Sequence, residues 1–244
     1  MRKTTTTLLT ATLALLAAGH AAAGPLLLGE TVQVGNSVGS VFTPSPVNGD
    51  NNGLYSNVSF RLDGTRNVAA SAGMFALEYT QSGSAAEQFY SFCLEPDVYL
   101  MPFSPGYTVS SLSGAGYNPL IGQLWNRYRG DVTNDTSAAA FQVAIWELSY
   151  DTFSDGNLGA GAFQLTSGGT VGSQAQYWLS SLNYAPGATD TFANLRVLVN
   201  HGGGALDRQD LLTQVPEPAT LALLSLGLAG IGFARRRRPL AAKV

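Results

Sequence analysis

Cys93 is the one cysteine in a chain of 244 residues, and its thiol is the first candidate for chemistry. A single cysteine excludes an intrachain disulfide and any zinc site built on several thiolates. In an oxidising compartment such a thiol is buried and inert, pairs with another chain, or is chemically engaged. The residues around Cys93, and those on a predicted helix later in the chain, help to decide among these three states of the thiol.

Two short segments bear on the chemistry of this thiol. Cys93 lies in the segment 90–95 (YSFCLE), and 49 residues after it Gln142 lies in the segment 141–146 (FQVAIW). The two segments resemble the thioester domains of bacterial surface adhesins, in which a cysteine late in a strand region is joined to the glutamine of a Gln-x-Ala-Ile/Val-Trp motif on a helix. The resemblance implies that Cys93 pairs with Gln142 and that Ala144, Ile145 and Trp146 complete the motif.

Elementary chemistry is consistent with this pairing. A thiolate held against a buried carboxamide attacks its carbonyl carbon and expels ammonia, which leaves an electrophilic thioester. The bond needs apolar cover because water hydrolyses it, and a set of neighbours is expected to supply that cover: Phe92, Leu94, Phe141, Ile145 and Trp146. Competing amines are scarce, since both lysines, Lys3 and Lys243, lie in the tails.

A simpler interpretation stands beside the thioester. A lone cysteine is often a small buried hydrophobe, and a glutamine on an amphipathic helix is often solvated or hydrogen-bonded. His201 is the one histidine outside the N-terminal tail, and in the thioester interpretation it is a possible base for the incoming nucleophile. No convincing catalytic set is present, so we expect neither an enzyme nor a metal site or cofactor. Glu95 and Asp97 are interpreted as solvated loop acids rather than a glycosidase pair.

The N-terminal residues 1–23 are typical of a secretory signal peptide. Arg2 and Lys3 precede an apolar run from Leu8 to Ala18, and small residues follow up to Ala23, where we expect cleavage.

The C-terminal residues 215–244 resemble the PEP-CTERM sorting signal of Gram-negative bacteria. Pro216, Glu217 and Pro218 precede an uncharged stretch, 219–234, which is expected to form one membrane-spanning helix. A basic cluster then orients the C-terminus toward the cytoplasm: Arg235, Arg236, Arg237 and Arg238. The resemblance implies recognition by an exosortase, cleavage near the Pro-Glu-Pro motif, transient anchoring in the inner membrane, and a link with exopolysaccharide and biofilm. An ordinary membrane anchor would give the same topology.

Residues 24–214 then form the exported domain. They hold six basic residues against fifteen acidic ones, a net charge of −9 with histidine neutral. This charge argues against nucleic acid or anionic lipid as a ligand.

Alternation of apolar and polar residues between Leu54 and Glu95 predicts antiparallel strands with one face in water. Turns are expected at 48–53, at 63–64 and at 82–83. The apolar sets are Val58, Phe60 and Leu62, then Phe75, Leu77 and Tyr79, then Tyr90 and Phe92. Pro102, Pro105 and Gly106 are expected to end this regular region.

Helical spacing dominates the middle of the chain. Leu120, Leu124 and Tyr128 predict a helix before Gly130, a second helix is expected over 137–150, and a third over about 173–182. The second helix places Phe141, Ile145 and Leu148 on one face. Strand patterns return at 192–199 and 211–215. This order predicts an α+β fold, an antiparallel β-sandwich or barrel with a small helical subdomain.

Together these features predict an exported protein of the cell envelope or extracellular matrix. Its expected function is adhesion, through a Cys93–Gln142 thioester that acylates an amine or hydroxyl on a partner. The alternative is a non-covalent protein that binds exopolysaccharide or biofilm matrix and keeps Cys93 as a buried thiol.

Overall fold

A computed structural model describes residues 25–35, 54–81, 84–98, 100, 104–151, 156–185, 194–200 and 208–215. The expected signal peptide, the turns at 48–53 and 82–83, His201 and the segment from Pro216 onward lie outside these ranges. Within the ranges, no helix is both long enough and apolar enough to cross a bilayer.

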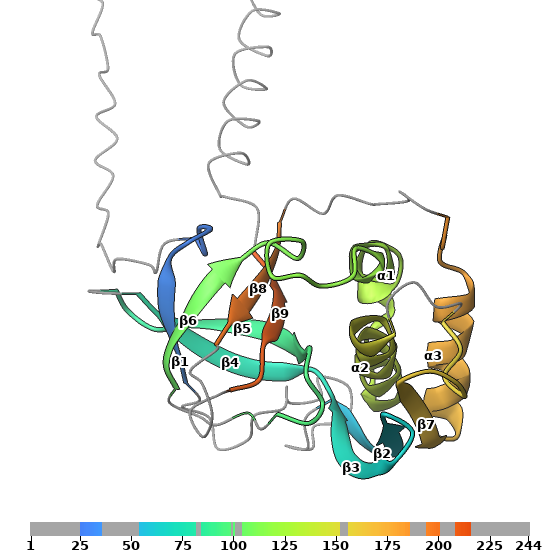
Figure 1. Ribbon diagram of the computed structural model, residues 1–244. Coiled ribbons are helices and arrows are strands. Elements are labelled where there is room, and N and C mark those ends of the chain that lie inside the picture. The colour runs from blue at the N-terminus through green and yellow to red at the C-terminus, as the bar shows by residue number, and fades with distance from the viewer. Residues whose placement is uncertain are drawn as a thin grey trace, which may run out of the picture.

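Among the described residues, antiparallel strands close into a barrel in the order β1-β4-β5-β9-β8-β6 (Figure 1). These strands are β1 (Thr31–Gly35), β4 (Phe75–Thr80), β5 (Glu87–Cys93), β6 (Ser104–Ser110), β8 (Leu195–Val199) and β9 (Leu211–Gln214). Of the two predicted architectures, the barrel is therefore the one that forms. Closure pairs each strand of the ring on both sides and so removes free sheet edges.

Side-chain alternation follows the prediction in β4 and only partly in β5. Phe75, Leu77 and Tyr79 are buried on β4, as the period of two requires. On β5, Phe92 is fully buried whereas Tyr90 is 53% exposed. Tyr90 and Phe92 are two residues apart, so their side chains point to the same face of β5. Helices pack over the end of the strand that holds Phe92, and therefore only Phe92 is covered.

Strand β6 corrects the expectation that the regular region ends at Pro105 and Gly106. Both residues lie inside β6, where the register against β1 shifts between Val32 and Val34. A bulge of this kind leaves a residue outside the ladder, which accommodates a proline that has no N–H to donate.

A second, three-stranded sheet lies beside the barrel in the order β3-β2-β7. Its strands are β2 (Tyr55–Leu62), β3 (Arg66–Gly73) and β7 (Phe163–Ser167). Asp63 and Gly64 have positive φ at the β2–β3 turn, as that dipeptide predicts. Strand β7 falls between two helices and pairs with β2, so the expected order of strands, helices and strands is wrong at this point.

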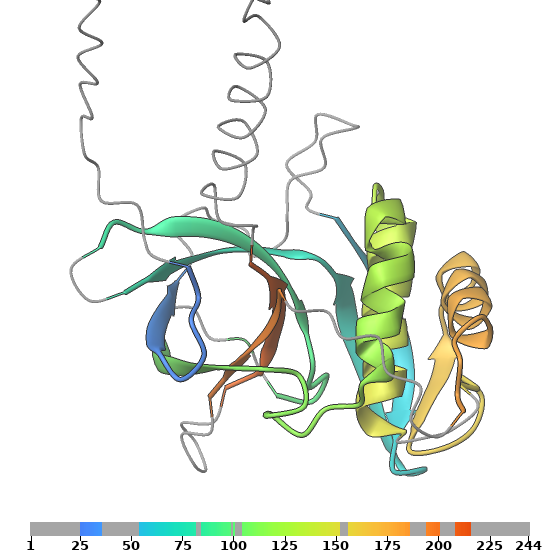
Figure 2. The ribbon, with the colours of Figure 1, turned by 90° about the horizontal axis from the view of Figure 1, so that it is seen from above.

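The helices are α1 (Leu120–Tyr128), a short 3-10 turn η1 (Arg129–Asp131), α2 (Asp135–Tyr150) and α3 (Thr170–Ser180). Asn134 caps α2, because its side chain accepts from the Ser137 N–H while the Ser137 hydroxyl accepts from the Asn134 N–H. Helix α2 is buried on all sides from Ser137 to Leu148, not along one face as its spacing suggested. The reason is its place between the barrel and α3, with the second sheet also against it (Figures 1 and 2).

Candidate functional site

The C-terminal end of β5 meets the middle of α2, and this contact brings Cys93 and Gln142 together. The Cys93 backbone N–H donates to Oε1 of Gln142 at 2.8 Å. In return, Nε2 of Gln142 donates to the Cys93 backbone carbonyl at 2.7 Å. The side-chain amide of one residue is thus bound to the main chain of the other by two hydrogen bonds.

Strand pairing explains why these main-chain groups are available. Cys93 pairs with Leu211 of β9 on one side of β5. On the other side the β4 ladder ends at the Phe75–Ser91 pair, and Gly73 belongs to β3 instead. The Gln142 carboxamide therefore takes the place of the missing peptide group beside Cys93, which satisfies polar atoms that would otherwise be buried without partners.

Both residues of the pair are removed from water, with exposed fractions of 1% each. Burial raises the pKa of the Cys93 thiol well above its usual range. The Trp146 indole and the Glu95 backbone N–H act in the opposite direction and are outweighed. Nε1 of Trp146 has no well-aligned hydrogen-bond partner among the described residues. The thiol is therefore protonated at neutral pH.

The residues that the thioester interpretation places beside the pair are all buried: Phe92, Leu94, Phe141, Ala144, Ile145 and Trp146. The Phe92 ring lies 4.9 Å from Phe141 and 5.9 Å from Trp125, measured between ring centroids. The Trp146 ring lies 5.3 Å from Phe60 of β2. Rings from β2, β5, α1 and α2 thus enclose this region.

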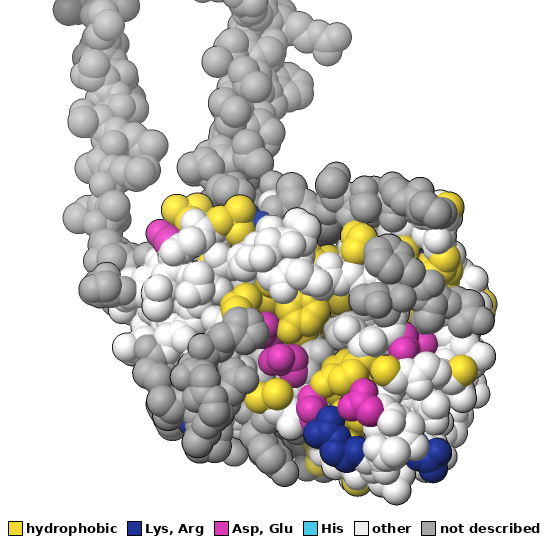
Figure 3. Space-filling model, in the orientation of Figure 1, with side chains coloured by type: hydrophobic (Ala, Val, Ile, Leu, Met, Phe, Trp, Pro, Cys, Tyr) yellow, Lys and Arg dark blue, Asp and Glu magenta, His cyan; other side chains and the backbone are white. Residues whose placement is uncertain are grey.

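A cleft of about 660 Å³ leads from the surface toward Cys93. Cys93 and Trp146 line it together with residues of β3, the segment 96–98 and Gln209. Figure 3 shows acidic side chains across this face beside arginines over the β2–β3 hairpin, with hydrophobic side chains between them.

Asp97 ties the loop after β5 to two other elements. Its carboxylate accepts from Nη2 of Arg66 at 2.8 Å and from the Tyr150 hydroxyl. Burial raises the pKa of Asp97, but these hydrogen bonds outweigh it and hold the pKa below its usual range. Asp97 is therefore an exposed loop acid, as expected, and these two hydrogen bonds hold its carboxylate in place.

Glu95 differs from the expected solvated acid, because it is only partly exposed and its Oε2 accepts from the Asp210 N–H at 2.8 Å. The same loop is bound by Nε2 of Gln209, which donates to the carbonyls of Glu95 and Val98. Sequence reasoning missed Gln209 and Asp210, since no local pattern links them to a loop more than a hundred residues earlier.

One family model matches the chain, the PEP-CTERM protein-sorting motif, at residues 214–238. No curated protein and no solved structure matches it. The match begins at Gln214, the last residue of β9. The chain is therefore an exported protein that carries the sorting signal recognised by an exosortase.

Proposed function

We propose that the exported domain attaches covalently to a partner through a thioester between Cys93 and Gln142. The observation that carries the proposal is the docking of the Gln142 carboxamide on the Cys93 main chain by two hydrogen bonds. A nucleophile and its electrophile belong to residues already in contact, so no rearrangement of the fold is needed to bring them together.

The hydrogen bond from the Cys93 N–H also favours the reaction. It is directed at Oε1 of Gln142, the oxygen on which negative charge develops when sulfur attacks the carbonyl carbon. The S–C bond forms, the C–N bond breaks, and the thiol proton leaves with the amide nitrogen as ammonia. Because burial raises the pKa of Cys93, we expect formation to be slow once the core has closed.

The completed bond would then be a stored electrophile. Buried rings around Phe92 and Phe141 exclude water, and the cleft beside Trp146 is the route for a partner's amine or hydroxyl. Attack by that group forms an amide or ester with the Gln142 acyl group and returns a thiol at Cys93. His201 remains a proposed base for the incoming group. Each molecule reacts once, so the protein is not proposed to be an enzyme.

The alternative is a non-covalent matrix-binding protein, and one observation favours it. The same two hydrogen bonds satisfy the Gln142 amide and the Cys93 main chain, so the pair also works as a purely structural bridge. In that case Cys93 stays a buried thiol, and attachment to exopolysaccharide depends on surface contacts.

Intact mass under non-reducing conditions separates the two functions. The thioester predicts a mass lower than the sequence value by one ammonia, and both Cys93→Ala and Gln142→Ala must abolish the deficit. Gln123→Ala is the matched control, because Gln123 is another buried helical glutamine with hydrogen bonds to a distant loop. Methylamine should add to Gln142 and free Cys93 for alkylation. If the measured mass equals the sequence value and Cys93 is alkylated only after unfolding, there is no thioester, and the pair is a purely structural bridge.

After export, we propose that cleavage near Pro216–Pro218 releases the domain from the inner membrane to the envelope or matrix. The PEP-CTERM match supports this path. The covalent partner is proposed to be a surface or matrix molecule with an accessible amine or hydroxyl.

A further inference from the structure

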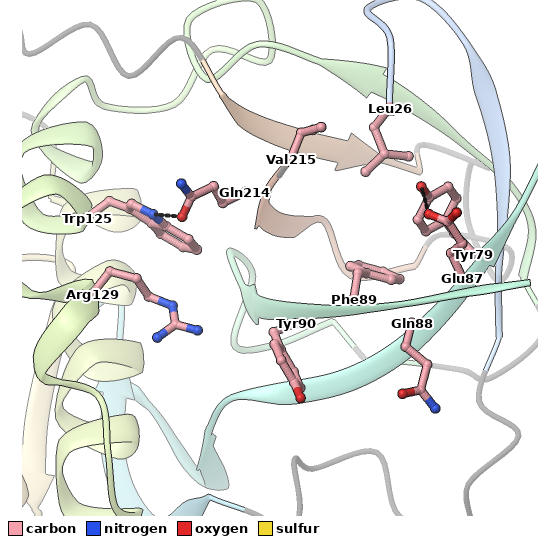
Figure 4. A pocket seen from close by; sticks show the side chains of 10 residues that line it. All are labelled: Leu26, Tyr79, Glu87, Gln88, Phe89, Tyr90, Trp125, Arg129, Gln214 and Val215. Carbon is pink, nitrogen blue, oxygen red and sulfur yellow. Dashed lines mark hydrogen bonds between the residues drawn. The ribbon is translucent and has the colours of Figure 1, made fainter. Parts of the chain in front are cut away.

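A second pocket, whose lining includes neither Cys93 nor Gln142, lies between the barrel and α1 (Figure 4). Its volume is about 430 Å³, the size of a small-ligand site. Arg129 and Trp125 line it from the helical side and Gln214 from β9, while Phe89 and Tyr90 project from opposite faces of β5. Elements far apart in the chain therefore build one concave surface.

Arg129 is the unusual group in this pocket. Its guanidinium carbon lies 5.7 Å from the Trp125 ring and 5.8 Å from the Phe92 ring, and Nη2 donates to the Met74 sulfur at 3.1 Å. No carboxylate within the described ranges forms an ion pair with it; the one ion pair found there joins Arg66 and Asp97. Burial lowers the pKa of Arg129, as expected for a cation that has lost water without gaining an anion.

We propose that this pocket binds the carboxylate of a sugar acid, with Arg129 as the anion-binding group. A guanidinium offers five donors in a planar fork that matches a carboxylate, and a sulfur acceptor satisfies little of that capacity. The contacts with the Phe92 and Trp125 rings are cation–π contacts, which do not use up the N–H donors of the guanidinium.

The remaining polar groups favour a ligand rich in hydroxyls. Glu87, whose carboxylate accepts from the Tyr79 hydroxyl at 2.9 Å, lies at the end of the pocket opposite Arg129 (Figure 4). Gln88 and Gln214 offer amide groups, and Tyr90 offers a ring that is 53% exposed. Carboxylates and amides accept hydroxyl protons, and an exposed ring stacks on the face of a sugar.

A peptide carboxylate is the less favoured occupant. Peptides commonly dock by adding a strand to an open sheet edge. Here β5 is paired with β4 and with β9, and the Tyr90 carbonyl also accepts from the Thr213 hydroxyl. Recognition in this pocket therefore depends on side chains.

Methyl glucuronide and methyl glucoside test the proposal, because they differ only in the carboxylate. In titration calorimetry with the full-length chain in a non-ionic detergent, we expect the glucuronide to bind at least about tenfold more tightly than the glucoside. Arg129→Gln should weaken glucuronide binding by at least about tenfold, and Arg61→Gln, which removes the same charge from β2, should not. Tyr90→Ala alters an exposed ring and should lower the affinity without unfolding the domain.

Three results would overturn this assignment. The first is that the glucuronide and the glucoside bind equally well, or that neither binds. The second is that Arg129→Gln binds the glucuronide as tightly as the wild type does. The third is that an acetylated dipeptide carboxylate binds more tightly than the glucuronide. None of them bears on the Cys93–Gln142 bond, so the two proposals stand or fall separately.

Discussion

Two buried side chains, Cys93 and Gln142, have separable effects on stability. Gln142→Ala removes both hydrogen bonds and leaves the Cys93 N–H and carbonyl buried without partners. We expect a loss of about 2–4 kcal/mol in the free energy of unfolding. Cys93→Ala keeps both main-chain bonds and should cost only about 1 kcal/mol if the bridge is structural. Urea unfolding measures both values.

A thioester changes that comparison. A covalent link between β5 and α2 is lost in either variant, so the two losses in stability would then approach each other. Two nearly equal losses would therefore contradict a purely structural bridge, while a loss below about 1 kcal/mol in Gln142→Ala would contradict the contact itself.

Arg129 is expected to serve binding at the expense of stability. Its cation is partly desolvated beside aromatic rings and lacks a carboxylate partner among the described residues. Replacing an uncompensated cation by an apolar side chain of similar length removes a desolvation cost. We expect Arg129→Met to keep or raise the melting temperature, by up to about 4 °C. Thermal unfolding followed by circular dichroism checks this, and a drop of several degrees would show that the cation contributes net stabilisation.

Among the elements, the loop after β5 is connected to β3 and α2 through Asp97. The folded state favours the ionised carboxylate, because hydrogen bonds from Tyr150 and Arg66 outweigh the effect of burial on its pKa. Its contribution to stability is therefore present above the unfolded carboxyl pKa of about 3.9 and is lost as the pH falls through the lower folded value.

The variant Asp97→Asn tests that contact. We expect a lower urea midpoint near pH 7 and a weaker dependence on pH below about 4 than in the wild type. Asp131→Asn, a change at an exposed acid of η1, is the control. Parallel pH profiles for the wild type and Asp97→Asn would show that the contact contributes no net stability.

At this scale the sequence predicted the helices better than the sheets. The spacing of Leu120, Leu124 and Tyr128 matches α1, since a helix is a local structure with a local period. Strands β1 and β7 and the bulged β6 were missed, because they depend on distant partners such as Thr108 for Thr31 and Leu62 for Phe163.

The Cys93–Gln142 pair and the Arg129 pocket also differ in how far the sequence predicts them. A short motif marks Gln142, and a resemblance links it to Cys93. The Arg129 pocket has no comparable signal, because its lining comes from segments around Leu26, β4, β5, α1, η1 and β9, and only the closed barrel brings them together.

For the whole molecule, the sorting signal follows the fold without an intervening linker. The Val215 N–H donates to the Asn194 carbonyl at 2.8 Å, and Gln214 accepts from the Trp125 indole at 3.2 Å. Pro216, Glu217 and Pro218 come directly after these anchored residues. The cleavage proposed near this motif would therefore fall directly after the described residues of the barrel, and we expect changes in the motif to act on processing and leave the folded domain intact.

Glu217→Ala tests this separation of sorting from folding. We expect the variant to accumulate as an uncleaved chain in the inner-membrane fraction, with the same melting temperature as the wild type, because Glu217 follows the last described residue of the barrel. Cell fractionation with intact mass reads out the processing, and Asp131→Asn, which changes one acid elsewhere, should be processed normally. Normal release of Glu217→Ala would show that cleavage does not depend on the acidic residue of the motif. A lowered melting temperature would instead mean that the motif packs against the barrel and that sorting and folding are coupled.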